Sequence, residues 1–190
     1  MPSLEAQVVN IADEIAYQSH DIDDGLRSGI LSLEALMGLD IFKAAADGKR
    51  YSDVAEIQRH HIVTSIMKLL VNDLAKSTDK LVREGGFKQV EDIYAHTGDL
   101  AQFSAEVKKM AAQLKDYLYE NFYNAPEVMK YNNEGKEVIR ILFHRLYDQP
   151  ALLPEKYQVQ IKEGEKHELI KDYIAGMTDS FALELYESLK

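Results

Sequence analysis

Residues 3–22 read SLEAQVVNIADEIAYQSHDI, and the periodicity of this stretch decides how the chain folds. At about 100° per residue in an α-helix, the aliphatic residues fall within one narrow arc: Leu4, Val8, Ile11, Ile15 and Ile22. The opposite side collects Asp13, Tyr17, His20, Asp21 and Asp24. The pattern predicts an amphipathic helix with an apolar side against a core and an ionisable side facing away from it.

The ionisable side of this helix is acidic rather than mixed. Five carboxylates lie on or near it: Asp13, Glu14, Asp21, Asp23 and Asp24. Among the nearby residues in the sequence, only Arg27 is close enough to offset the negative charge of these carboxylates. Like charges three or four residues apart oppose a helix by about 0.2–0.5 kcal/mol per pair. We therefore expect this side to be solvated, or to be neutralised by cations from elsewhere, such as a divalent metal.

The length and composition favour one soluble domain over residues 1–190. At this size about 70% of the unfolded surface is buried, and 46% hydrophobic with 28% charged residues is an ordinary globular composition. The formal net charge of −10 disfavours nonspecific binding to nucleic acid or an anionic membrane. The chain has no cysteine, which excludes disulfides and thiolate zinc sites. The lack of cysteine fits a reducing cytoplasm, and no apolar run is long enough for a membrane span. We therefore expect a cytoplasmic protein.

The rest of the chain is also helical in period, which predicts an all-α bundle of about seven or eight helices without strands. Ser52 is a candidate N-cap for the longest helix, 53–84, which ends at Gly85 and Gly86. Its apolar stripe is broad: Ile62, Ile66, Leu69, Leu70, Val71 and Leu74. Short helices are expected at 32–36 and from 40 to Gly48, and 87–103 are expected to be mainly loop.

Three further helices complete the prediction. Ser104 caps the first of them, and Pro126 begins the second, which continues toward Tyr147. The last runs from about 165 to 189, with a kink or a second cap near Gly176 and Thr178. Its apolar face is Ile170, Ile174, Met177, Phe181 and Leu185.

The segment ADEIAYQSHDIDDGL, residues 12–26, resembles part of a known family. Its counterpart is the segment that supplies the last metal-binding Asp in the deoxynucleoside triphosphate (dNTP) triphosphohydrolases, the dGTPase branch of the HD-domain metal hydrolases. The resemblance implies that Asp13 is that ligand, that Tyr17 lies along the bound nucleotide and that Asp21 reaches the deoxyribose hydroxyl. Four later segments resemble the family in the same order: QRHHIVTSIMKLLVNDL, DYLYENFYNAPEVM, IRILFHRLYDQPALLPEKY and KDYIAGMTDSFALELY.

The chain departs from the family pattern in its metal ligands. HD hydrolases have a His, then a His-Asp pair, then a distant Asp, and only the last-Asp segment is present. His20-Asp21 lies inside that segment and is not the HD pair. The resemblance therefore implies the C-terminal half of a larger enzyme, with the other three ligands upstream of Met1. No residue of this half is assigned a catalytic role, and alone it should be catalytically incomplete.

The resemblance also implies a reaction, a cofactor and partners. The reaction converts a dNTP, plausibly dGTP, and water to a deoxynucleoside and triphosphate. The cofactor is a divalent metal, Mg or Mn, with Fe, Co, Ni or Zn as alternatives. Members of the family are commonly homo-oligomers. One carboxylate is too few ligands for tight metal binding by this chain alone.

Each proposed contact also has a simpler structural interpretation. Asp13, Tyr17 and Asp21 are typical of a solvated helix face, and His20 is either a phosphate contact when protonated or an exposed side chain. His60 is expected to point inward with Val63, Met67, Val71 and Leu74. It is then either a core histidine with one hydrogen bond or a substrate contact. The aromatic residues of 117–123 are interpreted as packing: Tyr117, Tyr119, Phe122 and Tyr123.

Two other functions stay open. One is a noncatalytic helical module for assembly or regulation, and the other is an HD phosphohydrolase that acts on a different nucleotide. The chain has no Walker-type glycine loop, GxSxG, HExxH or EF-hand spacing, so those classes are not supported.

Overall fold

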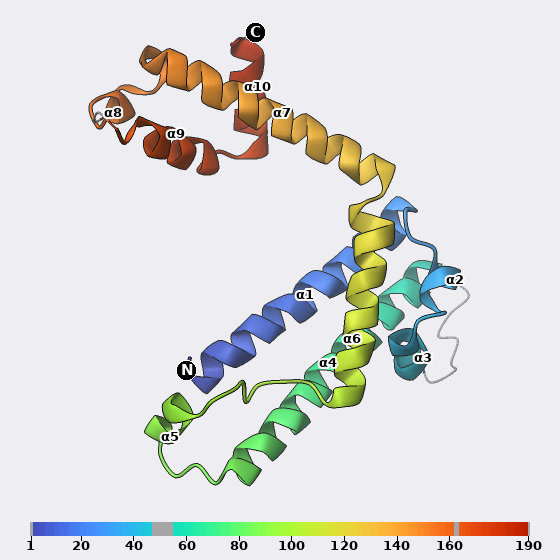
Figure 1. Cartoon of the computed structure of the whole chain (residues 1–190). Coiled ribbons are helices and arrows are strands. Elements are labelled where there is room, and N and C mark those ends of the chain that lie inside the picture. The colour runs from blue at the N-terminus through green and yellow to red at the C-terminus, as the bar shows by residue number, and fades with distance from the viewer. Residues whose placement is uncertain (1, 47–54, 162–163, 190) are drawn as a thin grey trace. The chain divides into compact units, whose positions relative to one another are not determined.

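The computed structural model describes residues 2–46, 55–161 and 164–189. Within these ranges the regular structure consists of ten α-helices, one π-helical turn and one 3₁₀ turn, without a strand (Figure 1). The predicted all-α fold class is confirmed. The chain divides into two compact units, Met1–Ala125 and Pro126–Lys190. The single domain predicted over 1–190 stays a prediction.

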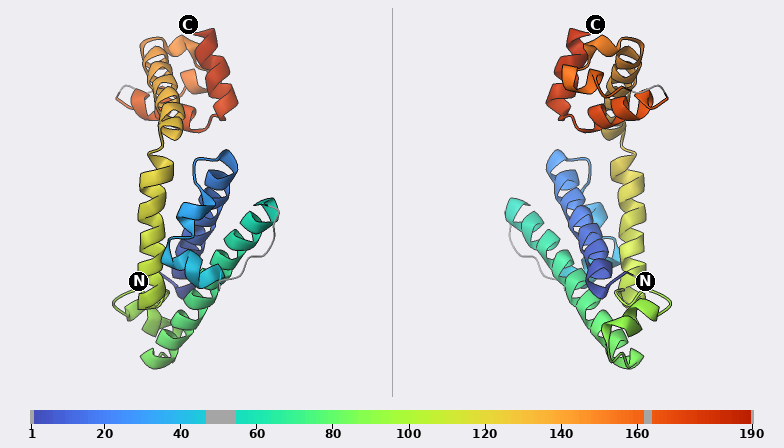
Figure 2. Two further views of the ribbon diagram at one scale, coloured as in Figure 1. Left: turned by 90° about the vertical axis from the view of Figure 1, so that its right-hand side faces the viewer. Right: turned by 90° about the vertical axis from the view of Figure 1, so that its left-hand side faces the viewer.

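The first unit is a bundle whose three longest helices enclose one core. Its elements are α1 Leu4–Ser28, α2 Leu33–Leu36, α3 Asp40–Ala46, α4 Ala55–Gly85, α5 Val90–Ala95, α6 Ala105–Leu118 and the π-helical turn Tyr119–Tyr123. Figure 2 shows α1 lying between α4 and α6, and α1 contacts both helices. The predicted helix end at Gly48 and the predicted cap at Ser52 lie outside the described residues.

Helix α1 has a defined beginning and end. The Ser3 hydroxyl accepts a hydrogen bond from the Ala6 N–H at 3.2 Å, as an N-cap does. The helix ends at Gly29, whose φ of 75° is left-handed and therefore favours glycine. It continues past the predicted boundary near residue 22 because no breaker precedes Gly29 except Gly25, which lies inside the helix.

The core of the first unit follows the predicted apolar faces. On α1, Ile15 and Ile22 are buried, and on α4 the buried stripe is Ile62, Ile66, Leu70 and Leu74. Val71 was predicted within that stripe but is 49% exposed. Gly25 permits close packing, because a Cβ at that position would lie 2.4 Å from Leu31 Cδ1. The core therefore depends on small residues of α1 as well as on large ones.

The second unit has its own core. Its elements are α7 Pro126–Asp148, the 3₁₀ turn Pro150–Leu152, α8 Glu155–Gln158, α9 Lys166–Ala175 and α10 Asp179–Ser188. Helix α7 packs on α9 and α10. The buried residues are Val138, Leu142, Leu146, Leu153, Ile170 and Ile174. None of the helices in the described residues is long and apolar enough to cross a membrane.

The predicted second cap in the last helical stretch is confirmed. The Thr178 hydroxyl accepts a hydrogen bond from the Phe181 N–H at 3.3 Å and starts α10 as a separate helix. Phe181 was predicted on the face of Ile170 and Ile174, but it is 44% exposed. The break before Thr178 changes the helical register, so the single face predicted from period 3.6 does not continue across it.

Candidate functional site

Three predicted contacts share one side of α1, since Asp13, Tyr17 and Asp21 are four residues apart. Asp13 is exposed, Tyr17 is 63% exposed and Asp21 is half-buried. Asp13 and Tyr17 line a hollow of about 270 Å³ between α1 and the stretch formed by α6 and the π-helical turn, here called the Asp13 hollow. Facing them across this hollow are Lys115, Leu118 and Tyr123.

Asp21 is held by a tyrosine that is distant in the sequence. The Tyr123 hydroxyl donates a hydrogen bond to the Asp21 carboxylate. Burial raises the pKa of Tyr123 to about 12, and the hydrogen bond to Asp21 and the negative charge of Asp21 contribute to the increase. The phenol therefore stays protonated at neutral pH and remains a donor, which fixes the orientation of the Asp21 carboxylate.

Lysine and arginine side chains of two other helices neutralise part of the acidic side of α1. This is the second of the two outcomes expected from the sequence, solvation or neutralisation by cations from elsewhere. Lys115 Nζ of α6 lies 3.0 Å from Glu14 Oε1, and the buried Gln18 side chain donates to the same oxygen at 3.3 Å. Arg59 Nε of α4 lies 2.8 Å from Asp23 Oδ1. Arg27 Nη1 is farther from Asp23, at 3.8 Å.

Two carboxylates of this side have no partner in the part of the chain that the structure describes, and of these only Asp13 lines the Asp13 hollow. Within the described residues, Asp13 and Asp24 are exposed and their carboxylates form no hydrogen bond or ion pair. Asp13 is thus neither buried in the apolar interior nor paired with an arginine of this part of the chain. Its carboxylate is chemically suited to serve as one oxygen ligand of a divalent cation.

The described residues do not offer a complete metal site. They contain no group of three or more His, Cys, Asp or Glu side chains that could hold a metal ion together. Asp13 could therefore supply only one ligand of a metal ion, and the other ligands would have to come from elsewhere. The assignment of Asp13 as a metal ligand stays a prediction.

The two histidine predictions have different outcomes. His20 is exposed on α1, on the ionisable side as predicted. His60 was predicted to point inward, and this is wrong: His60 is exposed on α4. The buried stripe of α4 is centred on Ile66, and six residues at about 100° each place His60 about 120° away from it. His60 does not line the Asp13 hollow.

Sequence reasoning missed two residues of this site, Lys115 and Tyr123. Tyr123 was interpreted as packing, yet it is 37% exposed and contacts Asp21. The packing interpretation holds for Tyr117 and Phe122, which pack against the core, while Tyr119 is 62% exposed. The spacing of eight between Lys115 and Tyr123 is a signal that could have placed both on one side of a helix.

Comparison with known proteins gives the class of the chain. Residues 101–188 match the family described as the phosphohydrolase-associated domain. Over its whole length, the chain is 33% identical to a protein of Geobacter sulfurreducens; over 98% and 99% of its length, it is 37% identical to proteins of Nitrosomonas europaea and Bordetella pertussis. All three relatives are named deoxyguanosinetriphosphate triphosphohydrolase-like proteins, and the chain spans about half of their length.

The chain is thus a helical protein in which residues 101–188 match a phosphohydrolase-associated domain. The chain belongs to the family of deoxyguanosinetriphosphate triphosphohydrolase-like proteins, and it corresponds to their C-terminal half. The predicted family resemblance is confirmed.

Proposed function

We propose that this chain is the C-terminal part of a metal-dependent dNTP triphosphohydrolase and that its α1 face completes the active site. The single observation that carries the proposal is the Asp13 hollow. There the predicted metal ligand, Asp13, and the predicted nucleotide contact, Tyr17, face a lysine and a tyrosine of the opposite wall. Relatives named as triphosphohydrolase-like, at 32–37% identity, support the reaction class.

The chemistry assigns a distinct role to each side chain. A divalent metal in such a site polarises the phosphate and activates water. Asp13 would contribute one oxygen ligand, and the remaining ligands would come from the other half of the protein. Lys115 can offset part of the negative charge of a triphosphate, because its ammonium group lies on the wall of the same hollow. Tyr17 would lie along the nucleotide.

Asp21 would accept a hydrogen bond from the deoxyribose hydroxyl. Tyr123 prepares it for this role by holding the carboxylate in one orientation before the ligand arrives. A fixed acceptor loses less conformational freedom when a ligand binds than a mobile one does. His20 shares the α1 side and would be an accessory phosphate contact. His60 is exposed on α4 and would contact the substrate from outside the Asp13 hollow.

The wider proposals follow from the family resemblance. The complete protein would work in the cytoplasm as a homo-oligomer, with dGTP as a substrate and Mg or Mn as the metal. The alternative of a noncatalytic module predicts no nucleotide turnover at all. The alternative of another nucleotide predicts turnover that does not depend on the deoxyribose hydroxyl.

A substrate lacking the hydroxyl tests the role of Asp21 in the complete protein. The wild type should hydrolyse dGTP with a kcat/KM about 10-fold or more above that for 2′,3′-dideoxy-GTP, since a hydrogen bond to a charged group contributes about 1.5–3 kcal/mol. Asp21→Ala should remove this preference and leave the activity on dideoxy-GTP nearly unchanged. Retention of the full preference by Asp21→Ala would contradict the dNTP assignment. Asp24→Ala, an exposed carboxylate of the same helix, is the matched control.

A further inference from the structure

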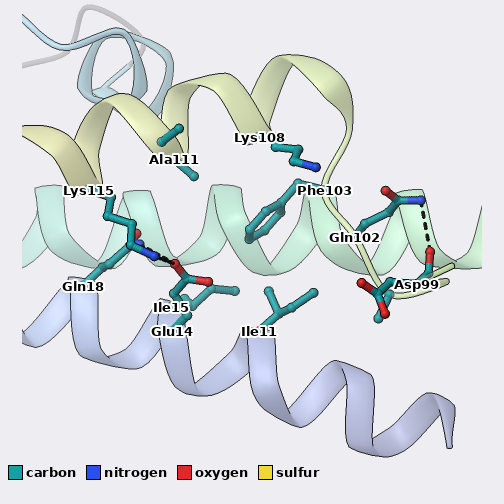
Figure 3. A pocket seen from close by; sticks show the side chains of 12 residues that line it. Ile11, Glu14, Ile15, Gln18, Asp99, Gln102, Phe103, Lys108, Ala111 and Lys115 are labelled. Carbon is teal, nitrogen blue, oxygen red and sulfur yellow. Dashed lines mark hydrogen bonds and ion pairs between the residues drawn. The ribbon is translucent and has the colours of Figure 1, made fainter. Parts of the chain in front are cut away.

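A second hollow lies beside the first, on the other side of the Glu14–Lys115 ion pair. It is bounded by α1, α6 and the loop 99–103, and Figure 3 shows Ile11, Ile15 and Phe103 meeting inside it. We call it the α1–α6 hollow. Its volume is about 320 Å³, within the range of about 300–1,000 Å³ that small-molecule sites occupy.

The wall made by the loop is fixed before any ligand arrives. Gln7 is buried, and its side-chain oxygen accepts hydrogen bonds from the N–H groups of Leu100 and Ala101, at 2.8 and 3.3 Å. At the other end, the Asp73 carboxylate accepts from the Ser104 N–H and hydroxyl, both at 2.8 Å. Two helices thus hold both ends of an irregular segment, and little ordering is needed when the hollow is occupied.

The floor of the hollow is apolar. Ile11, Ile15, Phe103 and Ala111 line it, and each is buried or packed against the core of the first unit. An apolar group placed on this floor would remove apolar surface from water, which is favourable in proportion to the area covered. The floor therefore favours a ligand whose main part is apolar.

The ionisable side chains at the rim determine which ligand charge is favoured. Four ionisable side chains line the hollow, and two of them, Glu14 and Lys115, are already paired at 3.0 Å. Within the described residues, the side chains of Lys108 and Asp99 form no hydrogen bond or ion pair. The Lys108 ammonium can receive one anionic group, whereas the Asp99 carboxylate opposes a second negative charge in the same space.

We propose that the α1–α6 hollow binds a small ligand with an apolar body and a single carboxylate, which pairs with Lys108. A polyphosphate would need several cations, and within the described residues Lys108 is the one lysine of this lining that is unpaired, because Lys115 already pairs with Glu14. The two hollows share Glu14, Gln18 and Lys115, but the apolar floor and Lys108 belong to the α1–α6 hollow alone. The inference does not rest on the proposed triphosphohydrolase activity.

Binding of 4-phenylbutyrate to the 190-residue chain tests this proposal. Titration followed by ¹H–¹⁵N NMR should shift the amide signals of α1 near Ile11, of the loop 99–103 and of α6 near Lys108. A ligand of this size should bind with a Kd of about 1 mM. The neutral 4-phenylbutanamide should bind about fivefold more weakly, because a charge-assisted hydrogen bond is stronger than a neutral one.

Three variants make the result decisive. Lys108→Met should remove the difference between the acid and the amide, and Lys109→Met, one residue further along α6 and outside the hollow, should preserve it. Ala112→Phe, which fills the hollow from its exposed edge, should abolish binding of both compounds while the far-ultraviolet circular dichroism stays unchanged. Shifts confined to other surfaces, no saturable binding of either compound, or an unchanged preference in Lys108→Met would overturn the proposal.

Discussion

The hydroxyl of Tyr123 donates a hydrogen bond to the carboxylate of Asp21, although 102 positions of sequence separate the two residues. The contact joins the π-helical turn at the end of α6 to the ionisable side of α1. It makes the orientation of a predicted nucleotide contact depend on the integrity of that turn.

The protonation of Tyr123 should be visible in the stability of the chain. Its pKa is raised from about 10 to about 12 in the folded state, so folding favours the protonated phenol. The stabilisation is fully present below pH 10 and is lost as the pH rises through 12. We expect Tyr123→Phe to be less stable than the wild type by about 0.5–1.5 kcal/mol at pH 8.

Urea unfolding at several pH values measures this effect. The difference between the wild type and Tyr123→Phe should shrink between pH 10 and pH 12, the window set by the two pKa values. Tyr119→Phe, an exposed tyrosine of the same turn, is the control and should differ little from the wild type at any pH. A difference that is constant through this window would contradict the assignment.

The ion pair between Arg59 and Asp23 should matter more than a surface pair on the same helix. Its side chains are 22% and 31% exposed, whereas those of Arg83 and Asp79 are 78% and 60% exposed at a similar distance. We expect Arg59→Met to lower the free energy of unfolding by about 1–2 kcal/mol and Arg83→Met by less than about 0.5 kcal/mol. Equal effects in chemical denaturation would count against this ranking.

Asp13→Asn should separate catalysis from folding. In the complete protein, loss of the proposed metal ligand should lower kcat/KM for dGTP at least about 100-fold. Stability should change by less than about 0.5 kcal/mol, because Asp13 is exposed. Asp24→Asn removes the same charge from α1 outside the Asp13 hollow and should retain activity. Equal activity losses in the two variants would show that only the net charge of the helix matters.

The 190-residue chain should self-associate in solution. Several large apolar side chains of the first unit are exposed, among them Val9 at 63%, Ile57 at 47% and Val71 at 49%. Exposed apolar surface of this kind promotes association. Light scattering should give a mass above the 21.6 kDa of one chain, and Val9→Lys with Val71→Lys should lower it. A single 21.6 kDa species at millimolar concentration would refute the expectation.

Much of the first unit could be predicted from local patterns. The period of α1 separated Ile15 and Ile22 from Asp13 and Tyr17 correctly, because each turn of a helix repeats the same direction. Ser104 caps α6 as predicted, because a short polar side chain before an apolar run indicates an N-cap.

Other features of the structure could not be predicted from local patterns, because they depend on contacts between residues distant in the sequence or on a change of helical register. Tyr123 could not be assigned to Asp21, since the path of α6 over α1 is not encoded in either segment alone. The inward direction predicted for His60 is wrong because Val63 and Met67, with which it shares a helix side, are only partly buried and lie at the margin of the stripe. Phe181 was misplaced because a new cap restarted the helix.

Because the Gln7 side chain accepts a hydrogen bond from the Leu100 N–H, hydrogen exchange at this amide reports the separation of α1 from the loop 99–103. The Leu100 N–H is buried against a side chain of α1 rather than within a helix, so deuterium can replace its proton only when α1 and the loop separate. The exchange rate of this one amide therefore measures how often the bundle loosens at the end of α1 where the chain begins.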